Sequence, residues 1–101
     1  AIDLFDLDPY NLRAGVGILI YDKNDQKRGF ASEAVALLIR YCFQILGLNQ
    51  LYCNIPADNI ASQALFKSKG FRVIGLKKEW IKTTSDWQDE YMLQLLNPKK
   101  Y

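Results

Sequence analysis

The chain has 101 residues, of which 50% are apolar, 24% charged and 13% aromatic, and its formal net charge is +2. This composition supports a single folded domain over residues 1–101 and excludes both an intrinsically disordered chain and a collagen-like chain. The charges are too nearly balanced to indicate a surface that binds nucleic acid. No apolar run is long enough to predict a membrane-spanning helix. We therefore expect neither nucleic acid nor a membrane as a partner.

The first half of the chain predicts two strands, a loop and a long helix. Residues 2–7 alternate apolar and acidic side chains, as in a strand with one buried face. Residues 14–21 form a nearly continuous apolar run, which is typical of an interior strand. The polar residues 22–29 end in a glycine and predict a loop. Residues 31–46 carry only two charged side chains, so they predict a helix buried over most of its circumference.

The second half begins with another strand and a capped helix. Gly47 suits the position just after a helix, and residues 50–55 predict a second interior strand. A turn follows, with Asp58 or Asn59 as the N-cap of a second helix, which ends at Gly70.

Residues 71–81 and 87–96 predict two further strands, joined as a hairpin. The order is β-β-α-β-α-β-β, an α/β domain (α+β in some schemes) with helices flanking a mixed sheet. The two strand–helix–strand connections favour parallel pairing at its centre. The chain starts directly in a strand without methionine, which predicts a fragment of a longer protein.

The ionisable residues exclude several kinds of site. The sequence has no histidine, which excludes histidine bases, catalytic triads and His-based metal sites, and we expect no metal. The two cysteines, Cys42 and Cys53, lie in apolar surroundings and predict reduced, buried thiols in a cytoplasmic protein.

Residues 26–31 carry the clearest chemical signal, because they lie between an interior strand and a helix. A helix N-terminus presents unpaired N–H groups to an anion, and Gly29 lets the backbone approach it closely. Lys27 and Arg28 add positive charge, and Ser32 adds a hydroxyl group. This pattern favours a pyrophosphate site, and the alternative is an ordinary solvated loop before a helix.

Two motifs extend this interpretation. Gln26-x-x-Gly29-x-Ala31 resembles motif A of the GNAT N-acetyltransferase superfamily. A second segment resembles motif B of the same superfamily, with the pattern Asn59-x-x-Ser62-x-x-Leu65-Phe66-x-x-x-Gly70-Phe71. In finer detail the chain resembles the branch that contains spermidine and ribosomal-protein N-terminal acetyltransferases. The resemblance covers the whole chain but only the C-terminal two-thirds of the family fold, whose N-terminal part is missing here.

The resemblance implies an acetyl-CoA-dependent enzyme that transfers an acetyl group to a primary amine by direct attack. The acceptor would be a polyamine, a protein N-terminus or another small amine. Residues 19–21 would pair with the pantetheine amides, residues 26–32 would wrap the pyrophosphate, and Asn59 would bind the pantetheine arm. The cofactor-binding residues implied in this way are Leu19, Ile20, Tyr21, Gln26, Lys27, Arg28, Gly29, Phe30, Ala31, Ser32, Asn59, Ser62, Gln63 and Phe66.

The sequence departs from the family at one important position. Many relatives carry a tyrosine where this chain has Phe66, and that tyrosine protonates the departing thiolate of coenzyme A. Phe66 has no proton to give, so core packing is the better explanation of this residue. The general acid is therefore unassigned, with Tyr52, Cys53 and Ser62 as candidates. Asn59, likewise, is also explained as a simple helix cap.

Three functions remain open at this point. The first is the N-acetyltransferase, the second a non-catalytic acyl-CoA-binding or regulatory domain of the same fold, and the third a small interaction domain without cofactor. The strand at residues 2–7 would form an exposed sheet edge, which predicts a homo-oligomer, most simply a dimer.

Overall fold

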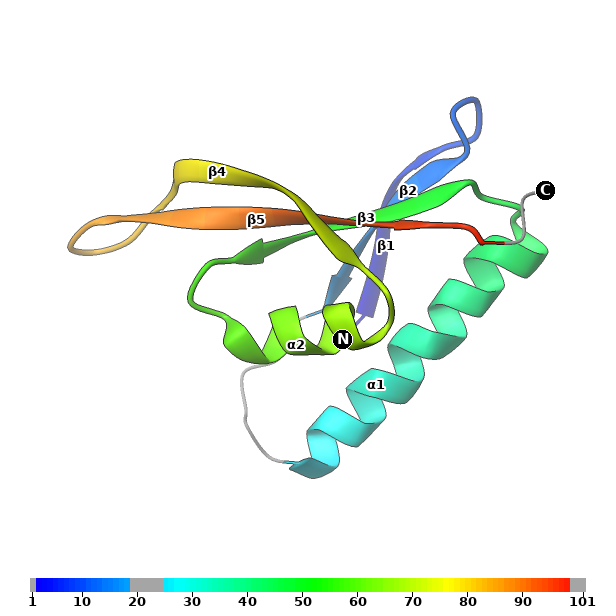
Figure 1. Cartoon of the computed structure of the whole chain (residues 1–101), viewed down its shortest axis with the longest axis horizontal. Coiled ribbons are helices and arrows are strands. Elements are labelled where there is room, and N and C mark those ends of the chain that lie inside the picture. Colours follow the sequence, from blue (N-terminus) through cyan, green and yellow to red (C-terminus); the bar gives the residue numbers. More distant parts are fainter. Residues whose placement is uncertain (1, 19–24, 99–101) are drawn as a thin grey trace.

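The computed structural model describes residues 2–18 and 25–98 of the chain. These residues form a five-stranded sheet and two helices, the first of which continues into a short π-helical turn, η1 (Figure 1). The elements are β1 (Ile2–Asp8), β2 (Arg13–Ile18), α1 (Asp25–Arg40), η1 (Tyr41–Ile45), β3 (Gln50–Pro56), α2 (Ile60–Ser68), β4 (Arg72–Lys82) and β5 (Trp87–Leu96).

The sheet is mixed, with the strand order β1-β2-β3-β5-β4. The central strands β2 and β3 pair in parallel, whereas the other neighbouring strands pair antiparallel. Both helices lie on the same side of the sheet, and the β4–β5 hairpin extends away from them (Figure 1). The predicted order of elements, the parallel centre and the position of β1 at an edge are therefore confirmed for the described residues.

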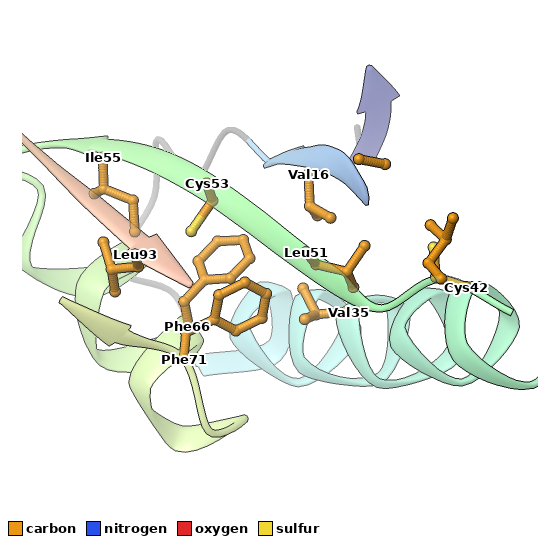
Figure 2. Packing of buried hydrophobic residues seen from close by; sticks show 11 residues of the cluster. Val16, Val35, Cys42, Leu51, Cys53, Ile55, Phe66, Phe71 and Leu93 are labelled. Atoms are coloured by element: carbon orange, nitrogen blue, oxygen red, sulfur yellow. The ribbon is translucent and has the colours of Figure 1, made fainter. Parts of the chain in front are cut away.

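The core lies between the sheet and the two helices. Alternate residues of β3 (Leu51, Cys53 and Ile55) are buried, as expected for one face of a strand. They pack with apolar side chains of the other elements (Figure 2), among them Val16, Val35, Phe66, Phe71 and Leu93. The rings of Phe66 and Phe71 meet edge to face with centroids 5.1 Å apart. The prediction that Phe66 packs in the core is confirmed.

The predicted N-cap of α2 and the predicted glycines after both helices are also confirmed. The side chain of Asn59 accepts a hydrogen bond of 3.1 Å from the backbone N–H of Ser62, so Asn59 is the N-cap of α2. Gly70 follows that helix with a φ of 99°, and Gly47 follows η1 with a φ of 65°. Both glycines adopt the left-handed conformation that commonly ends a helix.

The predicted loop at residues 22–29 is wrong over residues 25–29, because α1 begins at Asp25. Residues 26–28 are glutamine, lysine and arginine, which are good helix formers. A glycine inside a helix costs only about 1 kcal/mol, so Gly29 does not prevent the helix from starting earlier. Gly29 thus lies inside α1 and not before it.

The expectation that the long helix is buried over most of its circumference is wrong as well. Phe30, Leu37, Tyr41 and Ile45 are all exposed, Phe30 by 75%. A helix packed on one face of a sheet can bury only the side chains turned towards it. In α1 and η1 these include Ala31, Val35 and Cys42.

Replacing Leu51 by alanine would leave a cavity where β3 meets the helices. We expect Leu51→Ala to lower the free energy of unfolding by about 2–5 kcal/mol, because a fully buried side chain is truncated. Urea unfolding measures the change. The exposed Leu37 provides the control, since Leu37→Ala should have little effect. Equal losses in the two variants would contradict the placement of the core.

Candidate functional site

The candidate site is a cleft that opens where β2 and β3 part. Their parallel pairing comprises three residue pairs and ends with Gly15 opposite Tyr52. Beyond this point a cavity of about 300 Å³ is lined by β1, β2, β3 and the start of α2. Among its lining residues are Asn59, Ser62 and Phe66, which the sequence singled out. Their spacing of three and four residues places them on one side of α2.

Ser62 is the unusual residue of this cleft. It is 2% exposed, and its hydroxyl oxygen is buried without a hydrogen-bond partner among the described residues. Leaving a buried polar group unpaired costs about 1–3 kcal/mol, so nearly all such groups in native proteins find partners. The Ser62 hydroxyl is therefore available to hydrogen-bond a molecule that enters the cleft.

The turn between β3 and α2 is held by Gln63. Its side-chain amide donates hydrogen bonds of 3.1 Å to the carbonyl oxygen of Pro56 and 2.9 Å to that of Ala57. Together with the Asn59 cap, these bonds fix the start of α2 against the end of β3. Both hydrogen bonds described for the Gln63 side chain are thus made to backbone carbonyl groups. This supporting role was not predicted from the sequence. A glutamine four residues after an N-cap is too common to signal it.

Cys53 lines the cleft, but its thiol is expected to be unreactive. Its side chain is 1% exposed, and burial raises the pKa of the thiol from 9.0 to about 12. The thiol stays protonated at neutral pH, whereas a nucleophilic cysteine reacts as the thiolate. Cys53 therefore contributes to the wall of the cleft and is a poor candidate for covalent chemistry.

Tyr52 points to the opposite face of the sheet from Cys53. Its ring meets that of Phe5 edge to face, with centroids 5.9 Å apart. Partial burial raises the pKa of the phenol, and the negative charge of Asp6 adds to this increase. Of the three candidate acids, the structure therefore places Ser62 and Cys53 in the cleft, while Tyr52 does not line it.

The contact between β1 and β2 depends on a glycine that the sequence interpretation did not use. A Cβ atom at Gly15 would lie 2.2 Å from the ring of Phe5, so only glycine allows that ring to cover the strand. Phe5 and Gly17 both line the cleft. Two glycines in an interior strand are a signal for such a close approach.

The segment predicted to bind pyrophosphate is helical in the structure from Asp25 onwards. The unpaired N–H groups of α1 belong to its first four residues, 25–28, since the helix begins at Asp25. Gly29, Phe30, Ala31 and Ser32 lie beyond that turn, which corrects the expectation that Gly29 ends a loop just before the helix. Only the backbone of Gln26, Lys27 and Arg28 is described. Leu19, Ile20 and Tyr21 lie outside the described residues.

Other features of the described residues offer less chemistry. A larger hollow of about 490 Å³ lies beside α1 and η1, but its lining includes no unpartnered buried polar side chain in the described part of the chain. Residues 2–18 and 25–98 contain no cluster of three side chains suited to a metal ion. No helix in the same residues is both long and apolar enough to span a membrane.

Comparison with known proteins identifies the family. The model of the family described as "Acetyltransferase (GNAT) domain" matches residues 1–72. The chain belongs to the GNAT acetyltransferase family. The N-acetyltransferase p20 of Bacillus licheniformis is 38% identical over 92 residues, which cover 89% of this chain and 50% of that protein. The N-acetyltransferase YnaD of Bacillus subtilis is 31% identical over 77 residues, which cover 76% and 45%.

Solved structures of the family share this fold. An acetyltransferase of the GNAT family from Bacillus anthracis has a TM-score of 0.80 and 25% identity, over 95% of this chain and 57% of that one. Mutant forms of the spermidine/spermine N-acetyltransferase SpeG from Vibrio cholerae have a TM-score of 0.84 and 24% identity, over 98% and 59%. The GNAT chain described here thus spans about half the length of the curated relatives it matches.

The buried thiol of Cys53 predicts a loss of stability at alkaline pH. Because folding raises its pKa from 9.0 to about 12, the folded GNAT domain keeps this proton over a range in which the unfolded chain releases it. The free energy of unfolding should fall by up to about 1.4 kcal/mol per pH unit above pH 9. Urea unfolding of the wild type and Cys53→Ala at several pH values measures this, and parallel pH profiles would contradict it.

Proposed function

We propose that this chain is the acetyl-CoA-binding part of an N-acetyltransferase that acetylates a primary amine by direct attack. The observation that carries the proposal is the cleft between β2 and β3, which holds an unpartnered, buried hydroxyl group. Membership of the GNAT family and the similarity to N-acetyltransferases of Bacillus support it. Acetyl-CoA would supply the activated acetyl group as a thioester.

Ser62 fits the role of hydrogen-bond donor to the leaving sulfur atom. A thiol has a pKa near 8.5, so its thiolate leaves without full protonation, and a hydroxyl donor is sufficient to stabilise the developing charge. This explains how the family tyrosine can be replaced by Phe66. The phenylalanine ring packs in the core and lines the cleft, where it helps to exclude water.

The strand edge next to Ser62 suits an extended, amide-containing arm. Among the described residues, the pairing of β2 with β3 ends at Gly15, so the following residues of β2 turn an unpaired backbone edge towards the cleft. Such an edge binds an extended chain through main-chain hydrogen bonds. Asn59 lines the same cleft with its carbonyl oxygen engaged in the helix cap, so its amide N–H groups are the donors it would offer to the pantetheine arm.

We further propose a pyrophosphate contact at the start of α1, where the helix N-terminus favours an anion. Its residues would be Gln26 to Ser32, including the backbone of 26–28. The acceptor is proposed as a polyamine, a protein N-terminus or another small amine, and spermidine is the acceptor in the names of structural neighbours. A homo-oligomer and a cytoplasmic location stay predictions, and one neighbour is described as a dodecameric spermidine N-acetyltransferase.

Acetyl-CoA should raise the melting temperature of the protein. Ligand at 100 times its dissociation constant stabilises the folded state by about 2.7 kcal/mol, which corresponds to a shift of several degrees. Gly29→Glu should reduce the shift by repelling the pyrophosphate, whereas the uncharged Gly29→Gln should keep it. Both side chains have room, because nothing lies within 4 Å of a Cβ at this position. No shift with the wild type would favour an interaction domain without cofactor.

Replacing Ser62 by alanine should separate activity from stability. We expect Ser62→Ala to lower kcat about 10- to 100-fold, the effect of losing one hydrogen bond to a charged group. Its stability should stay equal or rise, since the variant removes an unpaired buried hydroxyl. Ser68→Ala is the control, because Ser68 is exposed on the same helix and bonds the carbonyl of Leu65. A wild-type protein that binds acetyl-CoA but acetylates no amine would favour the non-catalytic alternative.

A further inference from the structure

The helix that runs through α1 and η1 carries a second apolar stripe besides the one that it buries against the sheet. Phe30, Leu37, Tyr41 and Ile45 are exposed by 75%, 61%, 48% and 70%. Their spacing of seven and then four residues places them along one line of the helix, and Ala34 continues this line between the first two. Single exposed apolar side chains are ordinary, whereas a line of four large ones indicates a contact surface.

No element of the described structure covers this stripe. The helix runs along the outside of the molecule (Figure 1), and a different side of it packs on the core through Val35 and Cys42. A helix that packs on one partner needs one apolar stripe, and the side with Val35 already provides it. The exposed stripe therefore indicates a second partner.

Two charges of opposite sign border the stripe on one flank. Glu33 and Arg40 are both exposed, and neither forms an ion pair within the described part of the chain. They are seven residues apart, which places them on the same flank about 10 Å from each other along the axis, too far to pair within one helix. A surface with two separated charges of opposite sign is complementary to a copy of itself turned end to end.

An antiparallel pair of these helices satisfies the charges and the apolar stripe in one register. With the two-fold axis at Leu37, Glu33 of one copy comes opposite Arg40 of the second copy, and the symmetry forms this pair twice. In the same register Phe30 lies opposite Ile45 of the second copy. A parallel arrangement would instead place each charge level with its own counterpart, where like charges repel.

We propose that the stripe on α1 and η1 is a homodimer interface, in which it packs antiparallel on the same stripe of a second copy of this chain. The β1 edge is less suitable, because its pairing is irregular between Phe5 and Asp8 and irregular edge strands resist pairing with another chain. The interface leaves the cleft free, since Leu37, Tyr41 and Ile45 do not line it. A single helix pair is a small contact, so the dimer forms at micromolar concentrations and separates on dilution.

Cross-linking through a cysteine at position 37 tests the contact in the full-length protein. Cys42 and Cys53 are buried, so an introduced cysteine is the reactive one in the part of the chain described here. We expect Leu37→Cys, treated with a short bis-maleimide at about 100 μM protein, to give mainly covalent dimer that declines on dilution. Ile60→Cys is the matched control, because Ile60 is 66% exposed on α2 and should give monomer. The wild type measures the background.

Exchanging the two charges tests the register. Added to Leu37→Cys, Glu33→Arg should weaken the dimer about 10-fold by opposing like charges at two places, and Glu33→Arg with Arg40→Glu should restore it. Circular dichroism and melting temperature check that each variant is folded. Phe30 stays unchanged, because it also belongs to the proposed pyrophosphate segment.

Four results would each overturn the proposal. They are a Leu37→Cys protein that gives no dimer, equal dimer from Ile60→Cys, a folded double charge variant that does not recover, and a Leu37→Cys thiol that maleimide cannot label even at low protein concentration. The last result would mean that another segment of the full-length chain covers the stripe.

Discussion

The parallel pairing of β2 with β3 ends after three residue pairs, and the rest of the site depends on this early separation. Each of the two strands has a longer antiparallel partner. β3 pairs with β5 along its whole length, from Gln50 to Pro56, and β2 follows β1. The sheet therefore consists of two antiparallel parts, β1-β2 and β3-β5-β4, which are joined by the short parallel pairing of β2 with β3. Beyond the last pair of residues the two parts separate, and the cleft lies between them.

The polar groups around the cleft divide into those that build it and one that stays unpaired. Gln63 and Asn59 use their side chains to fix the start of α2 against the end of β3. The hydroxyl of Ser62 is carried on the same helix turn, buried and without a described partner. A fold optimised for stability alone would place an apolar side chain there, since an unpaired buried hydroxyl is unfavourable. The unfavourable group is consistent with selection for binding or catalysis.

Much of this site could be predicted from the sequence, and the errors have physical causes. Asn59, Ser62 and Phe66 lie at helical spacing after a turn, so local periodicity was sufficient to bring them to one side of α2. The start of α1 was misplaced because Gly29 looked like a helix boundary, although one glycine costs a helix only about 1 kcal/mol. The exposure of α1 was misjudged because an apolar sequence does not show how many of its faces the rest of the fold covers.

The sequence by itself determined the order of elements, the helix caps, the parallel centre of the sheet and the helix face that carries Ser62. These follow from local periodicity, capping residues and the handedness of strand connections. Only the tertiary structure decided that β2 and β3 separate after Gly15 and that Cys53 and not Tyr52 lines the cleft. Such features depend on pairing between segments far apart in the chain, and local patterns of side chains do not encode where that pairing stops.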